Sequence, residues 1–126
     1  MGVLPRKSER VVGSLLTEHD IQNRIRLALS KTGIPFRTNA GTFYQGERHG
    51  NTLVNIRPVA GLPEGFTDLI YFQQGGKTAF IEVKAPGKKA RKEQENFIRV
   101  MREMGFTAGV VHSVEEAQEL IGGLNE

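Results

Sequence analysis

Two acidic residues and a lysine stand inside two of the most apolar segments of the chain. Asp68 lies in FTDLIYF (66–72), and Glu82 and Lys84 lie in KTAFIEVKA (77–85). Both segments are rich in β-branched and aromatic residues, which predicts two strands, and the Gly-Gly loop between them predicts a hairpin. Charged side chains in half-buried strands are costly unless a partner compensates them, so these three are the first candidates for chemistry.

The hairpin predicts that the two acids face each other. A five-residue loop pairs Phe72 with Thr78, and the same register places Asp68 directly opposite Glu82 on one face of the sheet. Like charges in opposed positions destabilise a sheet. A hard divalent cation such as Mg²⁺ binds carboxylate oxygens and would neutralise the pair. The pair therefore indicates a metal site.

Two predicted helices each carry a polar residue in an apolar stripe. Glu18 occupies such a position in a helix predicted over residues 17–32, and Gln94 does so in a helix predicted over residues 88–104. Polar groups on a buried side need hydrogen-bond partners. One acidic site above the hairpin would give both of them partners.

The chemistry that these residues could perform is hydrolysis of a phosphodiester. Beside a bound cation, a lysine can orient the attacking water or stabilise charge on a phosphate oxygen, which is the role expected for Lys84. A run of basic residues follows this strand directly and would contact a phosphate backbone, namely Lys88, Lys89, Arg91 and Lys92. The alternative for the run is an ordinary solvated surface.

The remaining elements predict one α/β domain. We expect short strands at 35–39 and 51–59 around a Gly-rich loop at 41–51, then a buried strand at 106–113 and a helix at 114–121. The order is αβββαβα, a mixed sheet flanked by helices, over residues 15–126. Residues 1–14 are expected to form an arm without regular structure, which either touches DNA or touches nothing.

Composition narrows the function classes. The 126 residues include 17 Lys and Arg against 14 Asp and Glu, a net charge of +3, which permits a polyanionic partner. Because the chain has no Cys, disulfides and thiolate metal sites are excluded. No apolar run approaches the roughly 20 residues that a membrane span needs, so we expect a soluble, cytoplasmic protein.

The motifs together resemble the VRR-NUC branch of the PD-(D/E)XK nucleases. GFTDLI (65–70) is similar to the family's G-x-P-D segment, and IEVK (81–84) to its I-E-V-K segment. Gln94 with Phe97 matches Q-x-x-F, EHDI (18–21) matches the glutamate motif of the first helix, and RTNAG (37–41) matches R-x-N-x-G. One departure is Thr67, where the family has Pro, which puts the local turn in question.

The resemblance implies an endonuclease with the restriction-endonuclease-like αβββαβ core that needs Mg²⁺ or Mn²⁺. It implies that Asp68, Glu82 and the Val83 carbonyl hold metal, with Glu18 binding directly or through water. Lys84 would serve catalysis, and Gln94 would support the site.

The resemblance also implies the partner and the setting. Small stand-alone members, often from phages and bacteria, are similar to Holliday junction resolvases and work as homodimers. We therefore expect a homodimer that cuts branched DNA in a bacterial or phage-infected cell, because symmetric sites match a symmetric junction. Arg37 and Asn39 would add DNA contacts to those of the basic run.

Three alternatives stay open at this point. The same chemistry would suit a nicking or flap-type nuclease without junction preference. A noncatalytic nucleic-acid-binding module could keep the fold, although opposed carboxylates would repel phosphate. A structural or protein-interaction domain would need an exposed apolar patch, which the sequence does not reveal.

Overall fold

The computed structural model describes residues 16–126, so the expectation for residues 1–14 lies outside the described part of the chain. The elements in chain order are α2 Glu18–Leu29, β1 Ile34–Arg37, β2 Thr42–His49, β3 Thr52–Ala60, β4 Leu69–Gln73, β5 Lys77–Val83, α3 Lys92–Glu103, β6 Thr107–Val111, α4 Val114–Gly122 and the short 3₁₀ helix η1 Gly123–Asn125. None of the described helices has the length and apolar character needed to cross a membrane.

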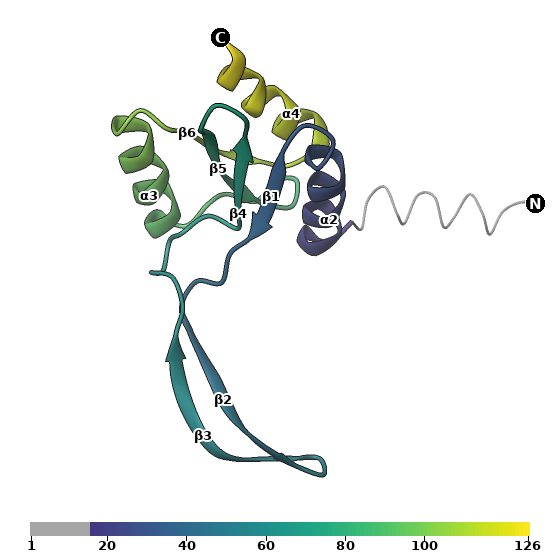
Figure 1. The fold of residues 1–126 in the computed structure, drawn as a ribbon, viewed down its shortest axis with the longest axis vertical. Helices are drawn as coiled ribbons and strands as arrows, with labels where there is room; N and C mark the ends of the chain where they lie inside the picture. The colour runs from purple at the N-terminus through teal and green to yellow at the C-terminus, as the bar shows by residue number, and fades with distance from the viewer. Residues whose placement is uncertain (1–15) are drawn as a thin grey trace, which may run out of the picture.

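A four-stranded mixed sheet forms the centre of the domain. Its strand order is β1-β4-β5-β6, with β6 parallel to β5 and the other neighbours antiparallel. Figure 1 shows α3 on one side of this sheet and α2 with α4 on the other. The expected fold class, a mixed sheet flanked by helices, is confirmed.

The β4–β5 hairpin has the predicted register. Phe72 pairs with Thr78, and Leu69 pairs with Ile81 at the other end of β4. Asp68 directly precedes β4, so the next position in the same register brings it opposite Glu82. The sequence prediction of two facing acids is therefore correct, although Asp68 itself lies just outside the strand.

Two separate apolar clusters hold the layers together. One joins α2 and α4 to the sheet and includes Ile25, Tyr71 and Val111. The other lies under α3, where Phe80 and Ile98 are buried. Because side chains alternate along a strand, β5 sends Ile81 and Val83 to the first cluster and Phe80 and Glu82 toward α3. The sheet thereby puts Glu82 on the face that α3 covers.

Two sequence predictions about the elements are wrong. Residues 41–51 were expected to be a Gly-rich loop, but most of them form β2, which pairs with β3 in a separate two-stranded sheet. Gly46 permits this pairing, since a Cβ there would lie 2.7 Å from the Val54 carbonyl oxygen. The helix expected from residue 88 begins at Lys92, because Arg91 is extended and its N–H donates to the Gln94 side chain.

Candidate active site

Asp68 is fixed by the turn that leads into β4. Its carbonyl oxygen accepts a hydrogen bond from the Thr38 N–H at 2.9 Å. Thr67 is fully buried, and its hydroxyl donates to the Leu69 carbonyl at 3.1 Å while its own carbonyl accepts from the Thr38 hydroxyl. Threonine hydroxyls therefore stabilise the turn at which this chain lacks the family's Pro. No motif in the sequence indicates that Thr38 belongs to this turn.

Asp68 and Glu82 are held together by reciprocal hydrogen bonds. The Asp68 N–H donates to Glu82 Oε1 at 3.1 Å, and the Val83 N–H donates to Asp68 Oδ2 at 2.9 Å. Glu82 is fully buried, whereas Asp68 is half-buried. The two carboxylates therefore share one end of the hairpin, with one of them open to solvent.

Gln94 and Lys84 complete the surroundings of Glu82. Gln94 Nε2 donates to Glu82 Oε2 at 2.7 Å, and Lys84 Nζ lies 3.3 Å from the same oxygen. The Gln94 Oε1 atom accepts from the Arg91 N–H at 2.8 Å, so the start of α3 fixes which end of the amide faces the carboxylate. The structure brings Asp68, Glu82, Lys84 and Gln94 together as the sequence analysis expected.

Burial raises the pKa of Glu82 to about 7, and the neighbouring Asp68 carboxylate adds to this rise. Lys84 acts in the opposite direction and lowers the pKa of Glu82, but it brings one positive charge against two carboxyl groups. A buried pair of this kind is stabilised by further positive charge, and carboxylate oxygens are the ligands that Mg²⁺ and Mn²⁺ prefer. The residues present therefore fit a hard divalent cation.

Glu18 is not gathered with the other acids. It is the first residue of α2, half-buried, on the helix that packs against the opposite face of the sheet from α3. Within residues 16–126, no group of three or more His, Cys, Asp or Glu side chains is close enough to hold a metal ion. Glu18 therefore does not form one group of potential metal ligands with Asp68 and Glu82.

The expected DNA-binding residues lie at the same end of the molecule as the acids. Four of them, Lys88, Lys89, Arg91 and Lys92, are exposed on the loop and first helical residue that follow β5. Arg37 and Asn39, also exposed, flank Thr38, which bonds the backbone of Asp68. Both groups of basic and polar side chains thus border the carboxylate pair, from two different segments.

His112 supports the basic loop and was not identified from the sequence. Its Nε2 atom lies 2.9 Å from the Lys88 carbonyl oxygen, and its Nδ1 atom lies 3.1 Å from Glu116 Oε1. The hydrogen bond to the Lys88 carbonyl raises the pKa of His112 most, and the bond to Glu116 adds to this rise. A histidine four residues before a glutamate at a helix start is the only signal that the sequence offers for this contact.

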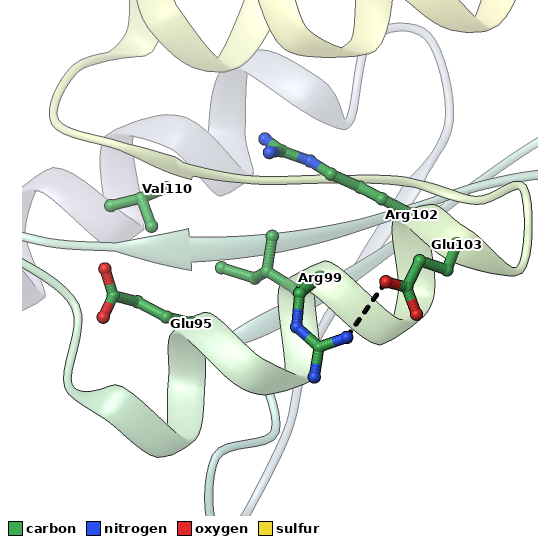
Figure 2. A pocket seen from close by; sticks show the side chains of 6 residues that line it. Glu95, Arg99, Arg102, Glu103 and Val110 are labelled. Carbon is green, nitrogen blue, oxygen red and sulfur yellow. Dashed lines mark hydrogen bonds and ion pairs between the residues drawn. The ribbon is translucent and has the colours of Figure 1, made fainter.

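A shallow hollow elsewhere on the domain is not the active site. It lies between α3 and β6 (Figure 2), and its lining includes Glu95, Arg99, Arg102 and Glu103. Its volume is about 590 Å³. Arg99 forms an ion pair with Glu103 at 3.0 Å. Charges of both signs balance there, and neither Asp68 nor the side chains around it line the hollow.

Comparisons with known proteins agree with this geometry. The sequence profile of the VRR-NUC domain matches residues 17–115. A solved structure described as a VRR_NUC domain is similar with a TM-score of 0.52 and 18% sequence identity, covering 84% of this chain and 96% of that one. No curated protein matches the chain. Because the profile covers most of the sequence, including Asp68, Glu82, Lys84 and Gln94, the chain belongs to the VRR-NUC family, which carries a nuclease domain of the PD-(D/E)XK type.

Proposed function

We propose that the protein is a metal-dependent, structure-selective DNA endonuclease that hydrolyses phosphodiester bonds in branched DNA as a homodimer, in the manner of Holliday junction resolvases. The observation that carries the proposal is the contact between the buried Glu82 carboxylate and the half-buried Asp68 carboxylate. A domain that only bound DNA would have no use for two acids in contact at the border of its basic surface, because they repel phosphate.

The cation would be Mg²⁺ or Mn²⁺, held by Asp68, Glu82 and the Val83 carbonyl, with Glu18 contributing through water. When bound, it would supply Lewis acidity and positive charge to the scissile phosphate. Lys84 lies 3.3 Å from Glu82 and is mostly buried, so its ammonium group is held at the carboxylates. From there it would orient the attacking water or stabilise charge that develops on a phosphate oxygen.

Gln94 would be a positioning residue. The Arg91 N–H donates to the amide oxygen of Gln94 and so orients the amide, whose nitrogen donates to Glu82. This bond fixes the Glu82 carboxylate in one rotamer. Groups that orient metal ligands commonly change activity by about 10- to 100-fold when they are removed. The basic residues after β5 would hold the backbone of the DNA against this end of the sheet.

The test is cleavage of end-labelled DNA by the full chain and two variants. Four-way junction, flap, duplex and single-stranded substrates are incubated with Mg²⁺, Mn²⁺ or EDTA. Asp68→Ala and Glu82→Ala should abolish cleavage and leave DNA binding largely intact. Glu119→Ala, at an exposed glutamate of α4, is the matched control and should cut like the natural protein.

Each outcome has a distinct meaning. Symmetric paired cuts in the junction, lost in EDTA and in both variants, would support a dimeric resolvase. Metal-dependent cutting of every substrate alike would remove the junction preference and leave a general nuclease. Full cleavage by either alanine variant would refute the site.

A further inference from the structure

The β2–β3 sheet stands apart from the rest of the domain as a ribbon. Figure 1 shows it extending away from the central sheet, beyond the ends of β1 and β4. Its strands pack mainly on one another, and almost every residue in them is exposed. The nine residues of β3 span about 30 Å. An isolated two-stranded ribbon is only marginally stable in water, so a surface that packs against it would stabilise it.

One face of the ribbon is apolar. Residues directly opposite each other share a face, and on this one Tyr44 lies opposite Pro58 while Leu53 lies opposite Arg48. Ile56 belongs to the same face, because a Cβ on Gly46 would meet both Ile56 and Leu53. Tyr44 is 69% exposed, Ile56 57% and Leu53 45%. We call Tyr44, Leu53, Ile56 and Pro58 the apolar ribbon face.

The other ribbon face carries the apolar pair Phe43 and Val59 at the base of the ribbon and hydrogen-bonded polar side chains farther out. The Asn55 amide donates to Glu47 at 2.7 Å, and Arg57 donates to Gln45 at 3.4 Å. The polar side chains of this face are therefore paired with one another across the strands. The apolar ribbon face has no such internal partners among the described residues.

A second apolar surface is left bare on the central sheet. The cluster under α3 is built on β5 and β6, so α3 does not reach the same face of β1 and β4. Ile34 is 57% exposed there, Phe36 54% and Phe72 41%, and the two phenylalanine rings pack edge to face. We call Ile34, Phe36 and Phe72 the bare sheet face. It lies on β1, an edge strand of the sheet, and on the neighbouring β4.

We propose that these two surfaces are the two halves of one interface between copies of this chain. The apolar ribbon face of each copy packs on the bare sheet face of the other, around a two-fold axis. Exposed apolar patches of this kind mark sites of protein contact. Each copy has two exposed apolar surfaces, and one two-fold symmetric dimer would bury both of them.

Charge argues against DNA as the occupant of the ribbon. Its strands carry Arg48 and Arg57 against Glu47, so its net charge is +1 with histidine neutral. Surfaces that bind DNA are strongly basic, because phosphate contacts supply most of the affinity. The run of exposed basic residues Lys88, Lys89, Arg91 and Lys92 lies instead on the loop and first helical residue after β5.

Area argues for a second copy. A ribbon about 30 Å long and 10 Å wide offers a face of about 300 Å². Packed once on an unrelated protein, it would bury about 600 Å² in total, which is below the range of specific interfaces. A reciprocal pairing uses two ribbons and buries about 1,200 Å², which reaches that range.

This pairing supplies an interface for the homodimer of the proposed function. The pairing itself does not rest on the proposed function, but its effect on cleavage does. The ribbon leaves the domain next to Thr38, whose N–H bonds the Asp68 carbonyl. A ribbon that is held by the second copy is therefore connected to the turn that carries Asp68. It would fix the separation of the two active sites, which paired cuts in a junction require.

The experiment measures molecular mass by sedimentation of the full chain in EDTA and without DNA. The natural protein should sediment as a dimer, at twice the 14.0 kDa of one chain. Ile56→Asp on the ribbon and Phe36→Asp on the sheet should each raise the dissociation constant at least 100-fold. Leu27→Asp is the control, since Leu27 on α2 is 71% exposed and belongs to neither surface. Far-ultraviolet circular dichroism checks that all three variants are folded.

Mixing the two interface variants tests the pairing itself. In a mixed dimer, the Phe36→Asp chain supplies an intact ribbon to the intact sheet face of the Ile56→Asp chain, so one of two contacts remains. Dimers should reappear in the mixture and not in either variant alone. If ribbons paired with ribbons instead, the Phe36→Asp chain would dimerise on its own, and that result or a mixture that stays monomeric would overturn the proposal.

Other results would also overturn it. A monomeric natural protein at 50 µM, or dimers unchanged in both variants, would show that these faces do not join two copies. Loss of DNA binding with unchanged mass would assign the ribbon to DNA instead. Because mass is measured without substrate, failure of the nuclease proposal would leave this result unaffected.

Discussion

Replacing Glu82 with glutamine should make the metal-free protein more stable at neutral and alkaline pH. The substitution keeps the shape of the side chain and removes its ability to ionise. In the folded protein, burial and the nearby Asp68 carboxylate raise the pKa of Glu82 from 4.5 to about 7. The native state therefore keeps a proton that the unfolded chain has already lost, and stability falls as pH rises through this window.

The pKa shift sets the size of the effect. One pKa unit corresponds to about 1.4 kcal/mol, so the rise of the Glu82 pKa from 4.5 to about 7 corresponds to about 3 kcal/mol above pH 8. Most of this, about 2 to 3 kcal/mol, develops between pH 5 and pH 8. Glutamine keeps one oxygen for Gln94 and Lys84 but places an NH₂ group where Glu82 Oε1 accepts from the Asp68 N–H, so one hydrogen bond is lost, which costs about 1 kcal/mol at every pH. The net gain at pH 8 is then about 2 kcal/mol.

The assay is urea unfolding in EDTA from pH 5 to pH 8, followed by circular dichroism. The free energy of unfolding of the natural protein should fall relative to that of Glu82→Gln by about 2 to 3 kcal/mol across this range. Glu119→Gln, which alters an exposed glutamate of α4, should give a profile parallel to the natural one. Parallel profiles for the natural protein and Glu82→Gln would refute the reasoning. Added Mg²⁺ should stabilise the natural protein and not Glu82→Gln, because the variant lacks a ligand charge.

Three further predictions follow from other parts of the structure. Charge reversal at Lys89 and Arg91 should weaken DNA binding and reduce the slope of log affinity against log salt by about 2, and an unchanged slope would mean an ordinary solvated surface. The raised pKa of His112 predicts that its hydrogen bonds stabilise the protein fully below its ordinary pKa of 6.5 and that this contribution is lost as pH rises through the higher folded value. Unfolding of His112→Asn should therefore show a weaker dependence on pH between 6 and 8, and an identical dependence would contradict the assignment. Gly65→Ala should destabilise the domain by about 2 to 4 kcal/mol, since φ is +93° and the new Cβ would lie 2.6 Å from a backbone oxygen. Gly76→Ala should cost only about 1 kcal/mol, because its φ of +74° is also positive but the space around it is open. Equal losses in the two glycine variants would remove the steric part of that argument.

The carboxylate pair could be predicted from the sequence because each step was local. A short hairpin with a Gly-Gly turn has few available registers, and side-chain alternation then places Asp68 opposite Glu82. The inward position of Gln94 followed from helical spacing in the same way. Thr67 in place of Pro did not disrupt the turn, because its hydroxyl and that of Thr38 supply hydrogen bonds.

Contacts between distant segments were outside the reach of such reasoning. Nothing in the spacing of α2 relative to the hairpin separates Glu18 from the other acids, and only the packing of α2 on the opposite face of the sheet does so. The support of the basic loop by His112 joins residues 24 positions apart. Residues 41–51 read as a loop, because glycine and polar residues hide the alternation of a strand that gains its partner only across the ribbon.

The sequence by itself determined the domain class, the facing acids with Lys84, and the membership of the family, because these depend on local periodicity and motif spacing. The tertiary structure decided which helix covers which face of the sheet. That choice buries Glu82 under α3 and raises its pKa, keeps Glu18 apart, and leaves the ribbon and the bare sheet face uncovered. Burial is a property of the whole packing arrangement, so a single segment of sequence cannot specify it.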